Sequence, residues 1–253
     1  MRARTAAALA VFLVAVGAAY ALKRFYSTAS AADLRFVLAP TAWLVEVAGG
    51  RRFDWTAGGY LSTELRFLIA PACAGVNFLI VAFAALVLGF VRPARPAWQN
   101  VGILLASAAA AYATTLLANA LRILIAIPLW THSVSFGWLT GDRLHELVGV
   151  VVFLGMLLLL YLAAHRLARA AVHAWVPLLP YVGMMLVVPL LRGAHQRAEF
   201  WVHAGIVAGA LAVAVVASVA LRRRGRSGPA RQGRRGAPSA LADDGSGAAP
   251  SAT

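Results

Sequence analysis

Three residues whose types can do nucleophilic chemistry together stand in largely apolar sequence: Cys73, Arg122 and His145. Charged and reactive side chains are costly at membrane depth, so each of them marks a candidate functional site. A thiol becomes a nucleophile when it loses its proton, and an imidazole can take that proton and return it to a leaving amine. A guanidinium can stabilise a thiolate or a developing oxyanion. The set therefore indicates acyl transfer through cysteine.

Each of the three residues also has an ordinary structural explanation. Cys73 is the only cysteine, so it forms no internal disulfide and can be a small packing residue. Arg122 can be an interfacial side chain that extends to the headgroups. His145 stands beside Asp142 and Glu146 and can belong to the polar start of a helix. The chemical interpretation depends on whether the three residues share one face of the membrane.

The composition is that of an integral membrane protein. Hydrophobic residues make up 61% of the 253, and charged residues only 13%, against roughly a quarter in soluble domains. The apolar runs are continuous, as in membrane helices, whereas barrel strands would alternate. Much of the net charge of +14 lies in an arginine cluster directly after the last apolar run. We interpret this cluster as a cytoplasmic topology anchor beside anionic lipid, and expect no nucleic-acid partner.

The apolar runs predict an all-α, polytopic transmembrane helix bundle of about six spans. These runs cover about residues 5–22, 67–91, 99–127, 144–164, 175–191 and 200–221. The first follows Arg2 and Arg4, and we interpret it as a retained anchor rather than a cleaved signal peptide. Residues 1–221 are then one transmembrane domain. Residues 222–253, which are rich in Arg, Gly, Ser, Ala and Pro, form a tail that we expect to be disordered.

The segment between the first two spans, Lys23–Arg66, is the most polar part of the chain before the tail. Within it, Phe36–Val47 is apolar but too short to span the bilayer, so we expect it to be interfacial or re-entrant. Glycine pairs indicate turns around a small hairpin near Phe53 and Tyr60.

The basic residues predict the orientation. Arginines at both ends of the chain favour the cytoplasm, which requires an even number of spans. Six spans satisfy this condition in the cell inner (plasma) membrane, and they make Lys23–Arg66 an extracytoplasmic segment. The basic residues in that segment weaken the assignment, although long segments cross largely regardless of charge.

With this orientation, the three residues reach the same membrane face. The helix from Cys73 to Val91 is roughly 27 Å long, which puts Cys73 near the outer end of its span. The next helix enters from inside, and from Gln99 to Arg122 it rises roughly 34 Å, which brings Arg122 to the outer interface. His145 begins the following span from outside. The sequence thus predicts one site at the extracytoplasmic rim.

Four further residues are candidates to support this site. Gly75 allows a close backbone approach near Cys73, and Asn77 and Asn119 are candidate hydrogen-bond partners for the site or the substrate. Asn119 lies one helical turn from Arg122. We expect Asp142 to cap its helix first and to orient His145 second.

The ordered motifs resemble those of the exosortase/archaeosortase family of multi-pass membrane proteins. That family carries a Cys-Ser/Ala-Gly motif, then Asn-x-x-Arg, then a His near the start of a later helix. Here these read Cys73-Ala74-Gly75, Asn119-Ala120-Leu121-Arg122, and His145 with Gly149 four residues on. The resemblance covers roughly residues 67–160. The run Cys-Ala-Gly-Val-Asn-Phe is similar to the exosortase K subgroup.

The resemblance implies a cysteine transpeptidase or protease that cleaves C-terminal sorting signals of exported proteins. Such a signal is a short motif, a transmembrane helix and an arginine cluster. Cys73 would be the nucleophile, His145 the acid/base and Arg122 the electrostatic stabiliser, with no cofactor and no metal. Ala74 stands where the family more often has serine, which removes a hydroxyl but no member of the triad. The acceptor of the acyl group stays open between water, a lipid and a glycan.

Three other functions compete with this interpretation. A metalloprotease would need a second histidine one turn after His145, where the chain has Gly149. A serine intramembrane protease would need a Gly-x-Ser-Gly element, which the sequence lacks. The third is a non-enzymatic transporter or assembly scaffold that binds an anionic group through Arg122. A transporter predicts polar residues near the bilayer midplane, and the sequence there is almost bare of charge.

Overall fold

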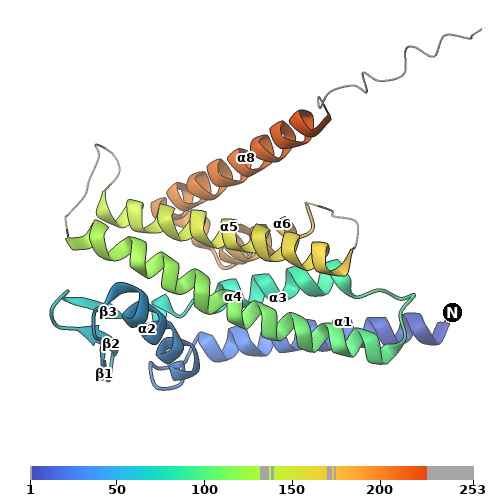
Figure 1. The fold of residues 1–253 in the computed structure, drawn as a ribbon, viewed down its shortest axis with the longest axis horizontal. Helices are drawn as coiled ribbons and strands as arrows, with labels where there is room; N and C mark the ends of the chain where they lie inside the picture. Colours follow the sequence, from blue (N-terminus) through green and yellow to red (C-terminus); the bar gives the residue numbers. More distant parts are fainter. Residues whose placement is uncertain (1, 132–136, 138–139, 170–172, 174, 227–253) are drawn as a thin grey trace, which may run out of the picture. The chain divides into compact units, whose positions relative to one another are not determined.

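The computed structural model describes residues 2–131, 137, 140–169, 173 and 175–226. Within these residues, five helical segments are long and apolar enough to cross a membrane. They are α1 (Arg2–Tyr26), Pro71–Phe90 with α3 (Val76–Phe90), α4 (Ala97–Thr131), α5 (Gly141–Ala168) and α8 (Ala198–Arg226). The prediction of a polytopic helical membrane protein is therefore confirmed. Figure 1 shows the helices, coloured along the chain from blue at the N-terminus to red.

The sixth expected span is shorter than predicted. It comprises α6 (Leu178–Val182), a π-helical turn (Gly183–Val187) and α7 (Val188–Leu191). Together these residues make an apolar helix of about 20 Å, against a hydrocarbon core of about 30 Å. The expected start at residue 175 is wrong because residues 175–177 form turns that end at Pro177, and the helix begins only after them.

The segment between α1 and α3 contains a helix and a small sheet. Helix α2 (Arg35–Gly49) covers the apolar stretch that was expected not to span, and it is not among the candidate spans. The strands β1 (Asp54–Thr56), β2 (Gly59–Ser62) and β3 (Phe67–Ile69) form an antiparallel sheet in that order. The predicted hairpin is confirmed by the pairing of Trp55 with Tyr60.

Strand β3 corrects one sequence prediction. Its residues were expected to begin the second span, but they pair with β2, with Ile69 opposite Tyr60. The error has a simple origin, because a short apolar run does not distinguish a buried strand from the start of a buried helix. Pro71 follows the strand and begins a separate turn. The second span is therefore shorter at its N-terminal end than the apolar run.

The helix α2, the sheet, the N-terminal end of α3 and the C-terminal part of α4 share one apolar core. Figure 1 shows α2 and the sheet together at one end of α4. Glu46 of α2 fixes the sheet, since its Oε1 accepts a hydrogen bond of 2.7 Å from the Phe53 N–H. The fully buried members of this core include Leu34, Val37, Leu38, Ile69, Ala74, Val76 and Ile123. This core supports the turn that carries Cys73, which contacts it from the edge.

Helix α3 is the central helix of the described part of the chain. In its span, 67% of the most apolar window is buried within the protein, whereas the value is 22% for α4. Its sequence is apolar on all faces, as a helix enclosed by others requires. Beyond its C-terminal end, the buried Asn100 of α4 bonds the backbone N–H and C=O of Arg92 and so fixes the α3–α4 connection. A rigid α3 gives the Cys73 turn a fixed base.

Residues up to Leu211 form one compact unit, and those from Ala212 form a second, so each is described by itself. All the residues of the candidate site belong to the first unit. Helix α8 continues to Arg226, past the expected start of the tail at residue 222. The rest of the expected tail, residues 227–253, lies outside the described residues.

Candidate functional site

Cys73 lies on a turn before its membrane helix, not inside the helix as expected. It ends the 3₁₀ turn Pro71–Cys73, and α3 begins at Val76. Gly75 separates the two because its φ of +67° is left-handed, a conformation that cannot continue a right-handed helix and that favours glycine. The half-buried thiol is therefore carried by a short connection between β3 and α3.

Gly75 also allows α4 to approach the Cys73 turn. A Cβ at this position would lie 3.3 Å from Thr115 Cγ2 and 3.5 Å from Asn119 Cγ. This is the close backbone approach expected from the sequence. Because α4 comes this close to the turn, the fully buried Asn119 can donate a hydrogen bond from Nδ2 to the carbonyl oxygen of Cys73. The amide at position 119 therefore links α4 directly to the nucleophile candidate.

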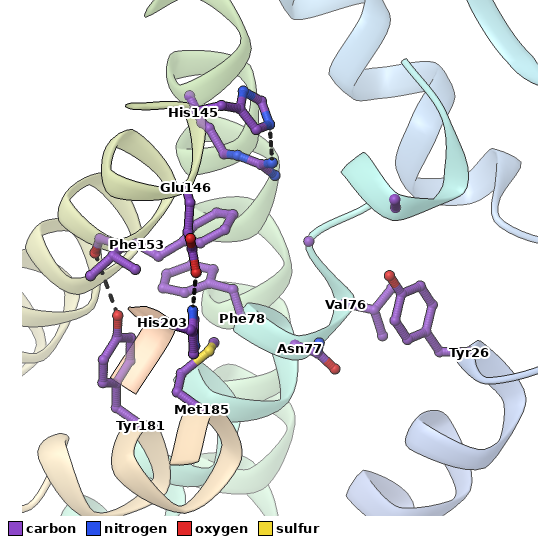
Figure 2. A pocket seen from close by; sticks show the side chains of 15 residues that line it. Tyr26, Val76, Asn77, Phe78, His145, Glu146, Phe153, Tyr181, Met185 and His203 are labelled. Carbon is purple, nitrogen blue, oxygen red and sulfur yellow. Dashed lines mark hydrogen bonds and ion pairs between the residues drawn. The ribbon is translucent and has the colours of Figure 1, made fainter. Parts of the chain in front are cut away.

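Arg122 and His145 are brought into direct contact. The distance between Arg122 Nη2 and His145 Nε2 is 2.7 Å. A guanidinium can only donate, so His145 Nε2 accepts, and the neutral ring then carries its proton on Nδ1. Figure 2 shows His145 at one edge of the pocket, where a dashed line marks this contact. The structure thus couples the expected stabiliser to the expected acid/base.

Helix α5 holds the guanidinium on two further sides. A Cβ on Gly149 would lie only 3.3 Å from Arg122 Nε, so the absence of a side chain there leaves room for the arginine. The Phe153 ring centroid lies 5.6 Å from Arg122 Cζ, within the range of a cation–π contact. His145, Gly149 and Phe153 recur at a spacing of one helical turn, so one face of α5 is shaped around Arg122.

A pocket of about 220 Å³ connects these elements. Its walls include Arg122 and His145, together with Ala72 and Gly75 from the Cys73 turn. The Cys73 side chain is not among the lining groups, so the turn borders the pocket through its other residues. The remaining lining residues are Tyr26, Val76, Asn77, Phe78, Glu146, Gly149, Val150, Phe153, Tyr181, Met185 and His203. Most of them are apolar or aromatic, with a few convergent polar groups, as in a ligand pocket.

Asn77 lies at the site, whereas Asp142 differs from its first expected role. Asn77 lines the pocket, and its Oδ1 accepts a hydrogen bond of 2.6 Å from Lys23 Nζ of α1, so its role toward a substrate stays a prediction. Asp142 was expected to cap its helix, and this is wrong. The N-cap of α5 is Thr140, whose side-chain oxygen accepts from the Arg143 N–H. The Asp142 side chain lies outside the described part of the structure, so its role beside His145 stays a prediction.

Sequence reasoning missed the second polar pair of the pocket. Glu146 Oε1 and His203 Nδ1 are in hydrogen-bonding contact between α5 and α8, and both residues line the pocket. His203 was not singled out from the sequence. Figure 2 shows the pair between Phe78 and Tyr181. The contact joins residues far apart in the sequence, and only the adjacency of Glu146 to His145 hinted at it.

The last turn of α1 was missed as well. Tyr26 lines the pocket and donates a long hydrogen bond of 3.4 Å to the Pro71 carbonyl. Lys23, one turn earlier, binds Asn77. The sequence held one available signal, namely a lysine and a tyrosine at i, i+3 spacing at the C-terminal end of the first span.

Comparison with known proteins gives one family match, which covers less than half of the chain. A family model described as transmembrane exosortase (EpsH) matches residues 55–162. This range contains Cys73, Asn119, Arg122 and His145, and it includes the segment on which the sequence resemblance depended. The match does not resolve a subgroup, so the similarity to exosortase K stays a prediction. No curated protein and no solved structure matches the chain.

Proposed function

We propose, on the premise that residues 55–162 form a transmembrane exosortase domain, that the protein is a membrane-embedded cysteine transpeptidase or protease. Cys73 is the nucleophile, His145 the acid/base and Arg122 the stabiliser of the oxyanion or thiolate. Its substrates are exported proteins that end in a short sorting motif, a transmembrane helix and an arginine cluster.

The observation that carries this proposal is the contact of 2.7 Å between Arg122 and His145 beside the Cys73 turn. Asn119 supports it, because its amide binds the Cys73 carbonyl one helical turn from Arg122. A snorkelling arginine and a helix-start histidine would have no reason to contact each other beside this turn. The pocket beside them provides room for a peptide group.

The first half of the reaction forms a thioester. The His145 imidazole takes the proton of the Cys73 thiol, and the sulfur attacks the carbonyl carbon of the scissile peptide bond. The carbonyl π electrons move to oxygen, where Arg122 stabilises the negative charge. The C–N bond then breaks, and the amine of the leaving segment takes the proton from the imidazolium. The products are an acyl-enzyme on Cys73 and the released C-terminal segment.

The arrangement of Arg122 and His145 implies an order of events. In the free enzyme the Nε2 lone pair of His145 is engaged by Arg122. A substrate carbonyl that draws the guanidinium to itself frees this nitrogen to accept the thiol proton. In the second half of the reaction an acceptor nucleophile, whether water, a lipid or a glycan, attacks the thioester and restores the thiol.

The topology proposed for this activity has both termini in the cytoplasm and the site at the extracytoplasmic rim. The Glu146–His203 pair supports an even number of crossings, because it brings the start of α8 beside the start of α5. The chain must return to the same end between these helices, and α6, the π turn and α7 are the helical part of that return. The basic tail then follows the last span into the cytoplasm.

The proposal is tested by replacing Cys73 in the organism that makes the protein. Cells that express either the native chain or Cys73→Ala are compared by mass spectrometry of the C-terminal peptides of exported proteins. Uncleaved sorting signals should accumulate in the variant to the level of a deletion strain, since loss of the nucleophile removes the covalent route. Equal membrane levels of the two proteins are checked on the same samples.

A transporter or scaffold gives the opposite result. Such a protein tolerates Cys73→Ala, and full processing by this variant would exclude the cysteine mechanism. A proteome without any protein that ends in a shared motif, an apolar span and an arginine cluster would remove the proposed substrate class.

A further inference from the structure

The outer end of α1 makes two contacts with the segment that carries Cys73. Lys23 Nζ donates a hydrogen bond of 2.6 Å to Asn77 Oδ1, and the Tyr26 hydroxyl donates one of 3.4 Å to the Pro71 carbonyl. The two acceptors lie on opposite sides of Cys73 in the sequence. The two donors are one helical turn apart and therefore share a face of α1. Figure 2 shows Tyr26 beside Val76, with Asn77 at the start of α3.

The Cys73 turn needs such an attachment. It consists of one 3₁₀ turn and a left-handed glycine, with neither a helix nor a sheet of its own. From α4 it is held by Asn119. A reacting group must be held within about half an ångström of its productive position, and a misplacement of about 1 Å can cost on the order of 100-fold in rate. A second attachment from the opposite helix would supply this rigidity.

Lys23 binds Asn77 inside the protein, whereas a lysine at the end of an apolar helix usually extends its ammonium to the polar interface. Lys23 is instead half-buried and donates to a neutral amide, while the adjacent Arg24 is exposed. The ammonium also lies 5.8 Å from the centroid of the Tyr26 ring, so the two side chains support each other.

Tyr26 reaches further into the site than Lys23. Its side chain lines the same pocket as Arg122, and its hydroxyl binds the backbone two residues before Cys73. Helix α1 lies outside the range of the family match, residues 55–162.

We propose that Lys23 and Tyr26 are positioning residues of the site. The last turn of α1 holds the Cys73 turn from one side and Asn119 holds it from the other, so that the thiol stays aligned with Arg122 and His145. This inference rests on the proposed function. It assigns to the first membrane helix a part in the chemistry besides anchoring.

The experiment uses the full-length protein in detergent micelles, where the single cysteine makes alkylation specific. The variants Tyr26→Phe and Lys23→Met each remove one hydrogen bond, and Lys23→Arg keeps a cationic donor. Tyr20→Phe and Arg24→Met are matched controls, because both residues lie on α1 and are exposed. The rate of Cys73 alkylation by iodoacetamide, the thermal unfolding midpoint and the processing of sorting signals in cells are measured for each.

Tyr26→Phe and Lys23→Met should raise the alkylation rate at least about threefold, because the released turn exposes its thiol, and lower processing about tenfold. The unfolding midpoint should stay within about 2 °C of the native value, as expected for a local change. Lys23→Arg should recover most of the processing, and the two controls should match the native protein.

Three outcomes decide the matter. An unchanged alkylation rate in both Tyr26→Phe and Lys23→Met would overturn the positioning role, whatever happens to processing. An alkylation rate that rises equally in Tyr20→Phe and Arg24→Met would also overturn it, since the effect would then belong to α1 in general. If the rate rises as expected but Cys73→Ala still processes substrates, the attachment stands and the proposed function fails.

Discussion

The Arg122 guanidinium of α4 donates a hydrogen bond of 2.7 Å to Nε2 of His145 on α5. Gly149, also on α5, leaves the space in which the arginine side chain lies. The residue four positions after His145 is therefore a glycine for a steric reason. A side chain there would displace the cation. This relationship explains why an apolar helix pair tolerates a charged residue near the site, and it makes several outcomes predictable.

Removal of the charge at position 122 should abolish most activity. Arg122→Gln should lower the processing of sorting signals by about 100-fold or more, the cost of losing an oxyanion donor. Arg122→Lys should recover only a small part, because an ammonium lacks the planar fork that can bind His145 and a carbonyl together. Processing in cells is the measurement, and the exposed Arg52 provides the control as Arg52→Gln. Native processing by Arg122→Gln would contradict the assignment.

Gly149→Ala should separate activity from stability. The added Cβ would lie 3.3 Å from Arg122 Nε, so the guanidinium must shift and processing should fall about tenfold. Alanine is the better helix former by about 0.5–1 kcal/mol, so the thermal midpoint should not fall. Gly155→Ala on the same helix has no atom within 4 Å of its new Cβ and should keep native processing. Equal processing by the two variants would refute the steric argument.

Asn119→Ala tests the link between α4 and the nucleophile. The substitution removes the donor to the Cys73 carbonyl inside a fully buried region. The free energy of unfolding should fall by about 1–3 kcal/mol, the cost of a buried group left without its partner. Denaturant titration in mixed micelles gives this value. Leu121→Ala truncates an exposed residue of the same helix and should cost clearly less. A smaller loss for Asn119→Ala than for Leu121→Ala would show that the hydrogen bond contributes little.

Labelling of intact cells tests the orientation. A membrane-impermeant maleimide should reach Cys73 from outside, because the site is proposed to lie at the extracytoplasmic rim. The control is Ala94→Cys in a Cys73→Ser background, in the exposed connection between α3 and α4. It should react only after lysis. The reverse pattern would invert the proposed topology.

The sequence predicted the helices and the three central residues because both signals are local. Membrane spans follow from apolar length, and the height of Arg122 follows from the helical rise. The start of α3 was misplaced because Phe67–Ile69 is a short apolar run, and such a run fits a buried strand as well as the start of a helix. Only the three-dimensional structure shows the positive φ of Gly75.

The missed contacts are tertiary and have no local signature. Lys23 and Asn77 are 54 positions apart, and Glu146 and His203 are 57 apart. No periodicity or propensity relates such pairs, because they depend on how the helices pack. The part played by α1 and α8 in the pocket therefore required the structure.

A Cys73 nucleophile must form a covalent bond with its substrate during turnover. This bond is detected by the intact mass of the purified full-length protein after incubation with a peptide from the end of a processed protein. We expect an adduct on Cys73 that hydroxylamine removes, as it does a thioester, and that Cys73→Ser does not form under the same conditions. Cleavage of the peptide by Cys73→Ser, or turnover by the native protein with no adduct on Cys73 at any time point, would contradict it.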